Sequence, residues 1–97
     1  MNKYIFTFGS GQLTEFNVRP NDVALIIEAN NENEARSIVF DYDGIGDKFC
    51  TSYPYSYIDQ FKNEYNMKEY SLDELESRRK SRMQRRSLRH MLSRMVN

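Results

Sequence analysis

Arginines recur at helical spacing along the end of this 97-residue chain. Residues 78 to 97 hold eight bases and no acid. At about 100° per residue, six arginines fall within or beside one narrow stripe of a helix: Arg78, Arg79, Arg82, Arg85, Arg86 and Arg89. Guanidinium groups bind phosphate oxygens well, and bases without acids on one helix repel each other. The stripe therefore predicts contact with a nucleic-acid backbone or an acidic protein surface.

The rest of the chain carries the opposite charge. Residues 1 to 77 hold all 14 acids and six bases, a net charge of −8, so the chain as a whole is neutral. This asymmetry indicates an acidic body with a basic segment that seeks an anion. Two alternatives stay open. The basic segment could neutralise its own body, or acids of the middle third could imitate a row of phosphates: Asp22, Glu28, Glu32, Glu34, Asp41, Asp43 and Asp47.

Residues that could perform catalysis or bind a metal are few. The one histidine, His90, lies among the arginines, where positive charge disfavours its protonation. Cys50 is the one cysteine and has no second Cys or His with which to build a metal site or a disulfide. We therefore expect no enzymatic activity, no catalytic residue, no metal and no cofactor.

Two glycine-containing motifs have simple structural interpretations. Gly9-Ser10-Gly11 lacks the remainder of a phosphate-binding loop and predicts a tight turn. The segment DYDGIGD at 41–47 lacks the glutamate that a calcium loop needs, and it predicts a helix end followed by a turn.

Tyrosines alternate around Pro54. Tyr53, Tyr55 and Tyr57 could stack on unpaired bases beside a basic groove. Aromatic side chains at alternate positions of a strand and its exit more often pack against neighbouring elements. Packing within the core is the favoured interpretation.

Four segments have the alternation or β-branched content of strands. They are 4–8, 14–18, 23–29 and 48–53, the last halted by Pro54. Two helices are expected between and after them. Asn31 and Glu34 form a capping pattern for a helix that closes at Gly44. Ser56 is expected to cap a second helix, which directs Ile58, Phe61 and Tyr65 inward and ends at Asn66.

The third helix has the clearest start signal in the chain. Ser71 and Glu74 form a capping box, and Tyr70 can pack on Leu75. No Pro or Gly follows, so a helix of up to about 26 residues is allowed. Its apolar residues form two separate patches. Leu72, Leu75 and Met83 should dock on the body, whereas a second stripe predicts a protein contact or a dimer: Leu88, Met91, Leu92 and Met95.

These elements predict an α+β fold. A sheet of about four strands has two helices packed on one face and is extended by a long basic C-terminal helix. The chain divides into an acidic body at 1–70 and an arginine-rich helix at 71–97. The residues expected to form most of the core are Tyr4, Phe6, Phe8, Leu25, Ile27, Ile38, Val39, Phe49, Ile58 and Phe61.

Four stretches of the body also resemble a known group of proteins. The stretches are YIFTFGSGQ, VALIIEA, ENEARSIVF and DKFCTSY, within residues 3 to 70. They resemble small accessory proteins of phages and mobile elements of low-GC Gram-positive bacteria, which begin with an FTFG-G-Q motif. The resemblance implies an inhibitor of a bacterial defence system, of the anti-CRISPR type. It implies no catalytic residues and does not extend to the arginine helix.

Charge layout and resemblance together give the functional expectation. The favoured hypothesis is a cytoplasmic, non-enzymatic inhibitor that binds a Cas effector with its guide RNA or DNA in the host bacterial cell. An effector offers both a basic channel and a bound nucleic acid. The alternatives are a small regulatory protein that binds DNA or RNA itself through the arginine helix, as a dimer, and a structural protein of a virion or replication complex. No apolar run is long enough to span a membrane.

Overall fold

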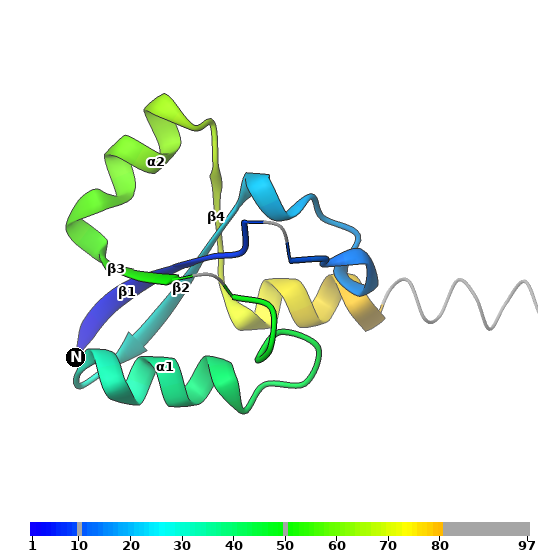
Figure 1. Cartoon of the computed structure of the whole chain (residues 1–97), viewed down its shortest axis with the longest axis horizontal. Coiled ribbons are helices and arrows are strands. Elements are labelled where there is room, and N and C mark those ends of the chain that lie inside the picture. The colour runs from blue at the N-terminus through cyan, green and yellow to red at the C-terminus, as the bar shows by residue number, and fades with distance from the viewer. Residues whose placement is uncertain (10, 50, 81–97) are drawn as a thin grey trace, which may run out of the picture.

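The computed structural model describes residues 1–9, 11–49 and 51–80 (Figure 1). Four strands form one mixed sheet in the order β3-β1-β2-β4. Strand β1 is antiparallel to both β2 and β3, and β2 is parallel to β4. The bounds are Asn2–Thr7 for β1, Val23–Ala29 for β2, Thr51–Pro54 for β3 and Lys68–Tyr70 for β4. The predicted α+β class is confirmed.

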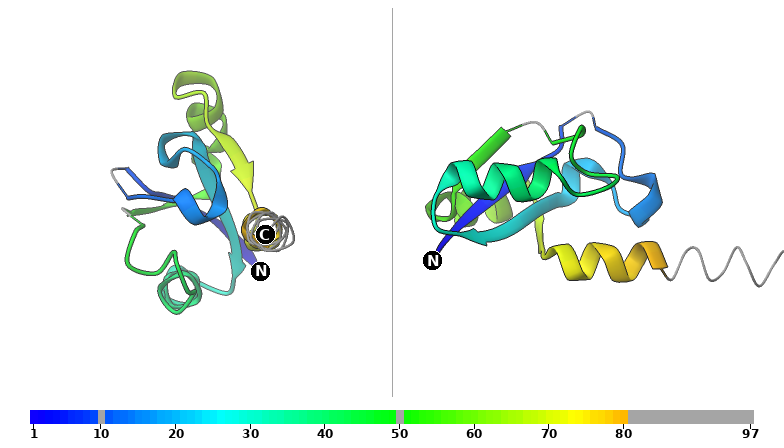
Figure 2. Two further views of the ribbon diagram at one scale, coloured as in Figure 1. Left: turned by 90° about the vertical axis from the view of Figure 1, so that its right-hand side faces the viewer. Right: turned by 90° about the horizontal axis from the view of Figure 1, so that it is seen from below.

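The helices lie on both faces of the sheet. Helix α1 spans Glu32–Phe40, α2 spans Ile58–Glu64, and residues 72–80 form a third helix, which includes the first bases of the basic segment. The described part of the chain also contains three short 3-10 helices, at Thr14–Phe16 (η1), Pro20–Asp22 (η2) and Tyr55–Tyr57 (η3). The views in Figures 1 and 2 show α1 and α2 on opposite sides of the sheet. The expectation that both pack on one face is wrong.

Strand alternation creates two separate apolar clusters. Phe6 pairs with Leu25 across β1 and β2, and both belong to the larger cluster, together with side chains from α1 and from helix 72–80. Ile5 points to the other face, where it packs with Ala24 and Ile58. Each face of the sheet therefore needs its own helical cover.

The segment 14–18 is not a strand. Thr14–Phe16 forms η1, and Asn17 follows in the left-handed conformation with φ 56°. Phe16 is fully buried because its ring packs into the larger apolar cluster. The apolar residue at this position therefore serves a single core contact and does not belong to a half-buried strand. The fourth strand of the sheet is β4 instead, a three-residue element that the sequence pattern did not predict.

Helix α1 begins as expected and ends early. The Asn31 side chain accepts a hydrogen bond from the Glu34 backbone N–H at 2.8 Å. The helix ends at Phe40 rather than near Gly44, because the chain then turns so that Ile45 is buried in the core. A Cβ on Gly46 would lie 1.9 Å from the Phe40 carbonyl oxygen, so this turn requires glycine.

Three other predicted side-chain positions are wrong. Ile38 is 37% exposed, since only Ala35 and Val39 on its helix are buried. Ser56 does not cap α2, which instead continues from η3 without a side-chain cap. Tyr65 is 58% exposed at the end of α2. The other expected core residues are buried or pack against the two clusters: Tyr4, Phe6, Phe8, Leu25, Ile27, Val39, Phe49, Ile58 and Phe61.

Helix 72–80 starts at the predicted capping box. The Glu74 backbone N–H donates to Ser71 Oγ at 3.1 Å, and the hydroxyl of Ser71 lies 3.4 Å from Glu74 Oε1. Leu75 is fully buried, and Tyr70 and Leu72 pack against the same cluster. The helix therefore docks on the body through its first apolar patch, as the sequence predicts. Met83 lies outside the described residues.

Replacing the cap residue should loosen this start. We expect Ser71→Ala to lower the free energy of unfolding by about 1 kcal/mol, because the Glu74 N–H loses its acceptor. Ser71→Asp, which keeps an oxygen acceptor, should stay close to wild type. Urea denaturation followed by circular dichroism measures both. Equal stability of Ser71→Ala and Ser71→Asp would contradict the capping role.

Candidate functional site

Arg78 attaches helix 72–80 to the body. Its Nε donates to the Phe16 carbonyl oxygen at 3.2 Å, and its Nη2 donates to the Asn17 carbonyl oxygen at 2.9 Å. Its guanidinium also lies 6.0 Å from the centre of the Tyr70 ring. These two carbonyls end the short helix η1, so Arg78 supplies donors to a helix terminus.

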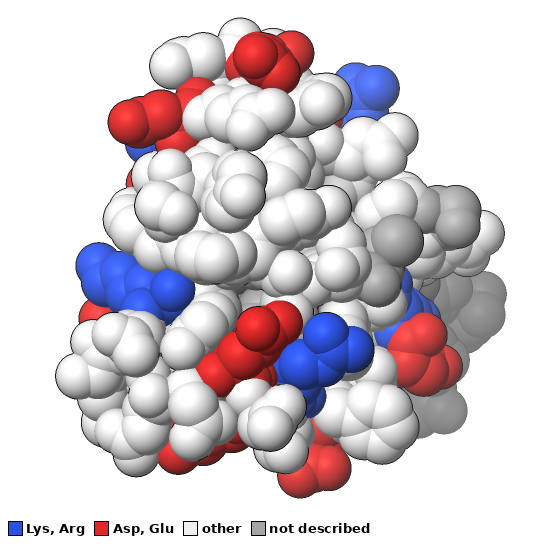
Figure 3. Space-filling view, turned by 60° about the vertical axis from the view of Figure 1, so that its left-hand side comes forward, with Lys and Arg blue, Asp and Glu red and all other residues white. Residues whose placement is uncertain are grey.

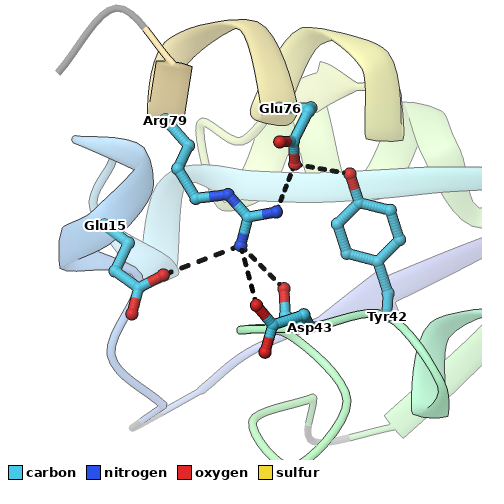
Figure 4. Close-up of polar contacts among 5 residues, drawn as sticks. All are labelled: Glu15, Tyr42, Asp43, Glu76 and Arg79. Carbon is cyan, nitrogen blue, oxygen red and sulfur yellow. Dashed lines mark hydrogen bonds and ion pairs between the residues drawn. The ribbon is translucent and has the colours of Figure 1, made fainter. Parts of the chain in front are cut away.

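Arg79 is the centre of a larger polar cluster (Figure 4). Its Nη1 donates to the Asp43 carbonyl oxygen at 2.9 Å and lies 3.8 Å from Asp43 Oδ2 and 3.6 Å from Glu15 Oε2. Its Nη2 pairs with Glu76 one helical turn earlier. One guanidinium thus faces three carboxylates, from η1, from the turn after α1 and from its own helix.

Two aromatic rings enclose the same guanidinium. Its carbon lies 4.9 Å from the centre of the Phe16 ring and 5.8 Å from that of Tyr42. The Arg79 side chain is only 14% exposed. Gly44, at φ +85°, leaves room for it, since a Cβ there would lie 3.0 Å from Nη1. Cation–π contacts and carboxylates together stabilise the charge in this partly buried position.

Tyr42 completes the cluster by binding the carboxylate that Arg79 holds. Its hydroxyl donates to Glu76 Oε2 at 2.6 Å. Burial and this hydrogen bond raise the pKa of Tyr42 from 10 to about 12. The bond from Tyr42, assisted by Arg79, lowers the pKa of Glu76. The Glu76 carboxylate is therefore protonated only at a lower pH than a free glutamate, which favours its pairing with Arg79.

The raised pKa of Tyr42 predicts a late-titrating tyrosine. Because the folded protein holds this proton more tightly, the contribution of Tyr42 to stability is complete below pH 10 and is lost as the pH rises towards about 12. Tyrosinate absorbance should therefore include a component with a midpoint near 12. Tyr42→Phe should lose one tyrosine's share of the late absorbance, whereas the control Tyr65→Phe should leave it unchanged. Tyr55, whose pKa is also raised by its hydrogen bond to Glu69, keeps its own share in both variants. Undiminished late absorbance in Tyr42→Phe would contradict this assignment.

The structure describes only two of the predicted arginine contacts. Arg78 and Arg79 both bind the body, as the alternative of self-neutralisation expects. The remaining candidates lie outside the described residues, and their roles stay predictions: Arg82, Arg85, Arg86, Arg89, Leu88, Met91, Leu92 and Met95. The same holds for His90 and Cys50.

The acids of the middle third are interspersed with bases. Four of the seven form ion pairs with bases of the same chain: Asp22 with Arg19, Glu28 with Lys3, Glu32 with Arg36, and Asp43 with Arg79. Figure 3 shows acids and bases close together on the lower part of one face, a mostly uncharged band across its middle, and further charges of both signs at its top. This arrangement differs from a uniform row of carboxylates.

The tyrosines around Pro54 have three different environments. Tyr53 packs edge-on against Phe61, with ring centres 4.9 Å apart, and Tyr55 donates a hydrogen bond to Glu69 Oε1 at 2.5 Å. The core interpretation is confirmed for Tyr53, which packs in the second cluster with Tyr55 beside it. Tyr57, in contrast, is 46% exposed.

Tyr57 and Tyr65 belong to a groove that sequence reasoning missed. The groove has a volume of about 460 Å³, and its aromatic lining is Tyr53, Tyr57, Phe61 and Tyr65. Ring centres of Phe61 and Tyr65 are 6.0 Å apart, as are those of Tyr53 and Tyr57. The signal in the sequence was the spacing of four between Tyr57, Phe61 and Tyr65, which places three rings along one side of a helix.

Fold and site define a small α+β protein in which helix 72–80 is anchored on the body. Comparison with protein-family models, curated proteins and solved structures finds no match for the chain. No helix within residues 1–9, 11–49 and 51–80 is long and apolar enough to cross a membrane. That same part of the chain holds no group of three or more His, Cys, Asp or Glu side chains placed to bind a metal.

Proposed function

We propose that this protein is a non-enzymatic inhibitor of a bacterial defence nuclease, which binds a Cas effector ribonucleoprotein and blocks its nucleic acid. The observation that carries the proposal is the anchored start of the basic helix. Leu75, Arg78 and Arg79 fix this helix to the body immediately before the remaining bases of the chain. A pre-positioned start lowers the entropy lost when a following segment binds a partner.

The anchor divides the arginines into two groups. Arg79 forms ion pairs with Glu15, Asp43 and Glu76. It would therefore attach the helix to the body and would not bind a ligand. The arginines beyond Lys80 would bind phosphates of a guide RNA or target DNA: Arg82, Arg85, Arg86 and Arg89. Such contacts contribute affinity without sequence specificity, which suits an inhibitor that must tolerate any guide.

The body would contribute through its net charge. Residues 1 to 80 hold 14 acids and nine bases, a net charge of −5, and residues 81 to 97 carry +5. A Cas effector presents a positively charged channel filled by nucleic acid. The acidic body would oppose the channel while the basic segment contacts the RNA. Opposite charges on the two parts would favour one orientation of binding.

The resemblance of the body to phage and mobile-element accessory proteins supports the same proposal. It suggests that the protein acts in the cytoplasm of the host bacterium. Its partner would be a nuclease that destroys the DNA of the invading element. None of these steps requires catalysis by the protein itself.

The test is capture of a partner with and without nuclease digestion. Tagged protein is incubated with lysate of bacteria that express a Cas effector and its guide. We expect the effector and guide RNA to be recovered together, and added protein to suppress cleavage of target DNA by the purified complex. Recovery of nucleic acid without the effector, together with undiminished cleavage, would overturn the proposal.

A regulatory protein that binds DNA or RNA itself is the second candidate. The observation that favours it is the groove with exposed Tyr57 and Tyr65, a second surface suited to nucleic acid. In this case the second apolar stripe would form a dimer, through Leu88, Met91, Leu92 and Met95. Sedimentation of the free protein as a dimer, and binding of nucleic acid without any effector, would favour this candidate.

A further inference from the structure

We propose that the aromatic groove on the α2 side of the sheet binds an unpaired nucleobase. The inference rests on the nucleic-acid contact of the proposed function and adds a second surface to it. The groove and helix 72–80 belong to opposite faces of the sheet, since Phe61 packs in one apolar cluster and Leu75 in the other.

The groove is uncharged in a chain rich in charge. Charged residues make up 29% of the sequence, yet none of the ten described residues that line the groove is acidic or basic. A lining without charge disfavours a phosphate or carboxylate as the inserted group, because burial of an anion without a partner is costly. A nucleobase is neutral and needs no charged partner in the groove.

The exposed rings provide stacking surfaces. Tyr57 and Tyr65 are 46% and 58% exposed, so a large part of each side chain is accessible to a ligand. Behind them, Tyr53 and Phe61 are packed edge-to-face at 4.9 Å and hold the wall in place. Stacking on such rings contributes affinity for any of the bases, because every base has an aromatic face.

Polar groups in the groove match the edge of a base. Asn21, Gln60 and Thr7 bring two amides and a hydroxyl to a lining that is otherwise mostly aromatic and apolar. The side-chain amide nitrogen of Gln60 donates one hydrogen bond to Glu64 Oε2 at 3.3 Å. Amides both donate and accept hydrogen bonds, as the edges of bases do. A proline-rich peptide would also fill the groove, but it offers carbonyl acceptors and few N–H donors, so these groups favour a base.

The test compares a short oligouridylate with an abasic oligomer of the same length. Both present the same phosphates, so only the first can fill the groove. We expect wild-type protein to bind the oligouridylate about 5- to 150-fold more tightly, the range that stacking of one base gives. In Tyr57→Ala/Tyr65→Ala this ratio should fall to about one. Because both residues are exposed, the variant should keep a native circular-dichroism spectrum.

The matched control is Phe40→Ala. Phe40 is 69% exposed on α1, outside the groove, so this variant should keep the wild-type ratio. Equal affinity of wild-type protein for both oligomers, with salt-dependent binding of each, would overturn the base site and leave the phosphate contact standing. If neither oligomer binds, the phosphate contact fails, and titration with uridine decides the groove separately.

Uridine carries no phosphate and therefore tests the groove alone. We expect it to shift the ring NMR signals of Tyr57 and Tyr65, with smaller changes at Tyr42. No shift with uridine would overturn the inference. A shift with an uncharged proline-rich peptide, in the absence of any shift with uridine, would also overturn it and would assign the groove to a peptide.

Discussion

Partner binding should be abolished when the four arginines beyond the anchor are replaced together by Glu, while the body stays folded. The four are Arg82, Arg85, Arg86 and Arg89. The change turns the net charge of residues 81 to 97 from +5 to −3. If each wild-type arginine neutralises one phosphate, the logarithm of affinity should fall with that of salt at a slope of about −3. Affinity measured at several salt concentrations, with circular dichroism of the variant, provides the check.

The variant leaves Arg78 in place for a structural reason. Arg78 donates to the carbonyls of Phe16 and Asn17, so its replacement would disturb the body as well as the basic segment. The control is Leu88→Ser with Met91→Ser, which should disrupt a protein contact and leave the salt slope unchanged. Binding that survives the four Glu substitutions would mean that the inhibitory surface lies elsewhere, first of all around Asp22 to Asp47.

Loss of the Leu75 side chain should produce the largest loss of stability. Leu75 is fully buried in the larger apolar cluster, where it links the basic helix to β1, β2 and α1. Leu75→Ala removes buried methyl groups and leaves a cavity, so we expect the free energy of unfolding to fall by about 2–5 kcal/mol. Urea denaturation of wild type and variant measures the difference.

Leu72→Ala is the control for Leu75→Ala. Leu72 lies on the same helix but is only partly buried, so its truncation should cost clearly less. If the two variants lose equal stability, the docking of this helix would not depend on the Leu75 contact. Leu75→Ala should also weaken partner binding, because the basic segment would lose its fixed starting point.

Local signals in the sequence predicted the parts of the fold that depend on near neighbours. The capping box of Ser71 and Glu74 and the Asn31 cap both form as expected, because each needs only residues three positions apart. The apolar strand at 23–29 also forms with the predicted bounds. In these segments local preference and tertiary packing agree.

Distant contacts decide the parts that the sequence pattern predicted wrongly. The segment 14–18 alternates like a strand. Arg78, 62 residues after Phe16, instead donates a hydrogen bond to the Phe16 carbonyl oxygen, and the guanidinium of Arg79 lies over the Phe16 ring. Strand β4 has only three residues, too few for any periodicity, and exists through its parallel pairing with β2. The count of four strands was right, although one of the four was placed wrongly.

The candidate site could be predicted only in part. The charge of Arg78 and Arg79 was evident, but their binding to the body depends on a turn at Asp43 and a buried ring at Phe16, both remote in sequence. The groove combines α2 with Pro20 and Asn21, which no local pattern links to it. Spacing along one helix reveals one wall of a groove and never the other.

Both edges of the sheet are poor templates for a further strand. Strand β4 has three residues, and β3 has four and ends in Pro54, which has no N–H to donate. Long regular edges allow sheets of separate molecules to join and grow into fibrils. The folded body should therefore remain free of amyloid-like association in concentrated solution, even though strand β2 is largely apolar.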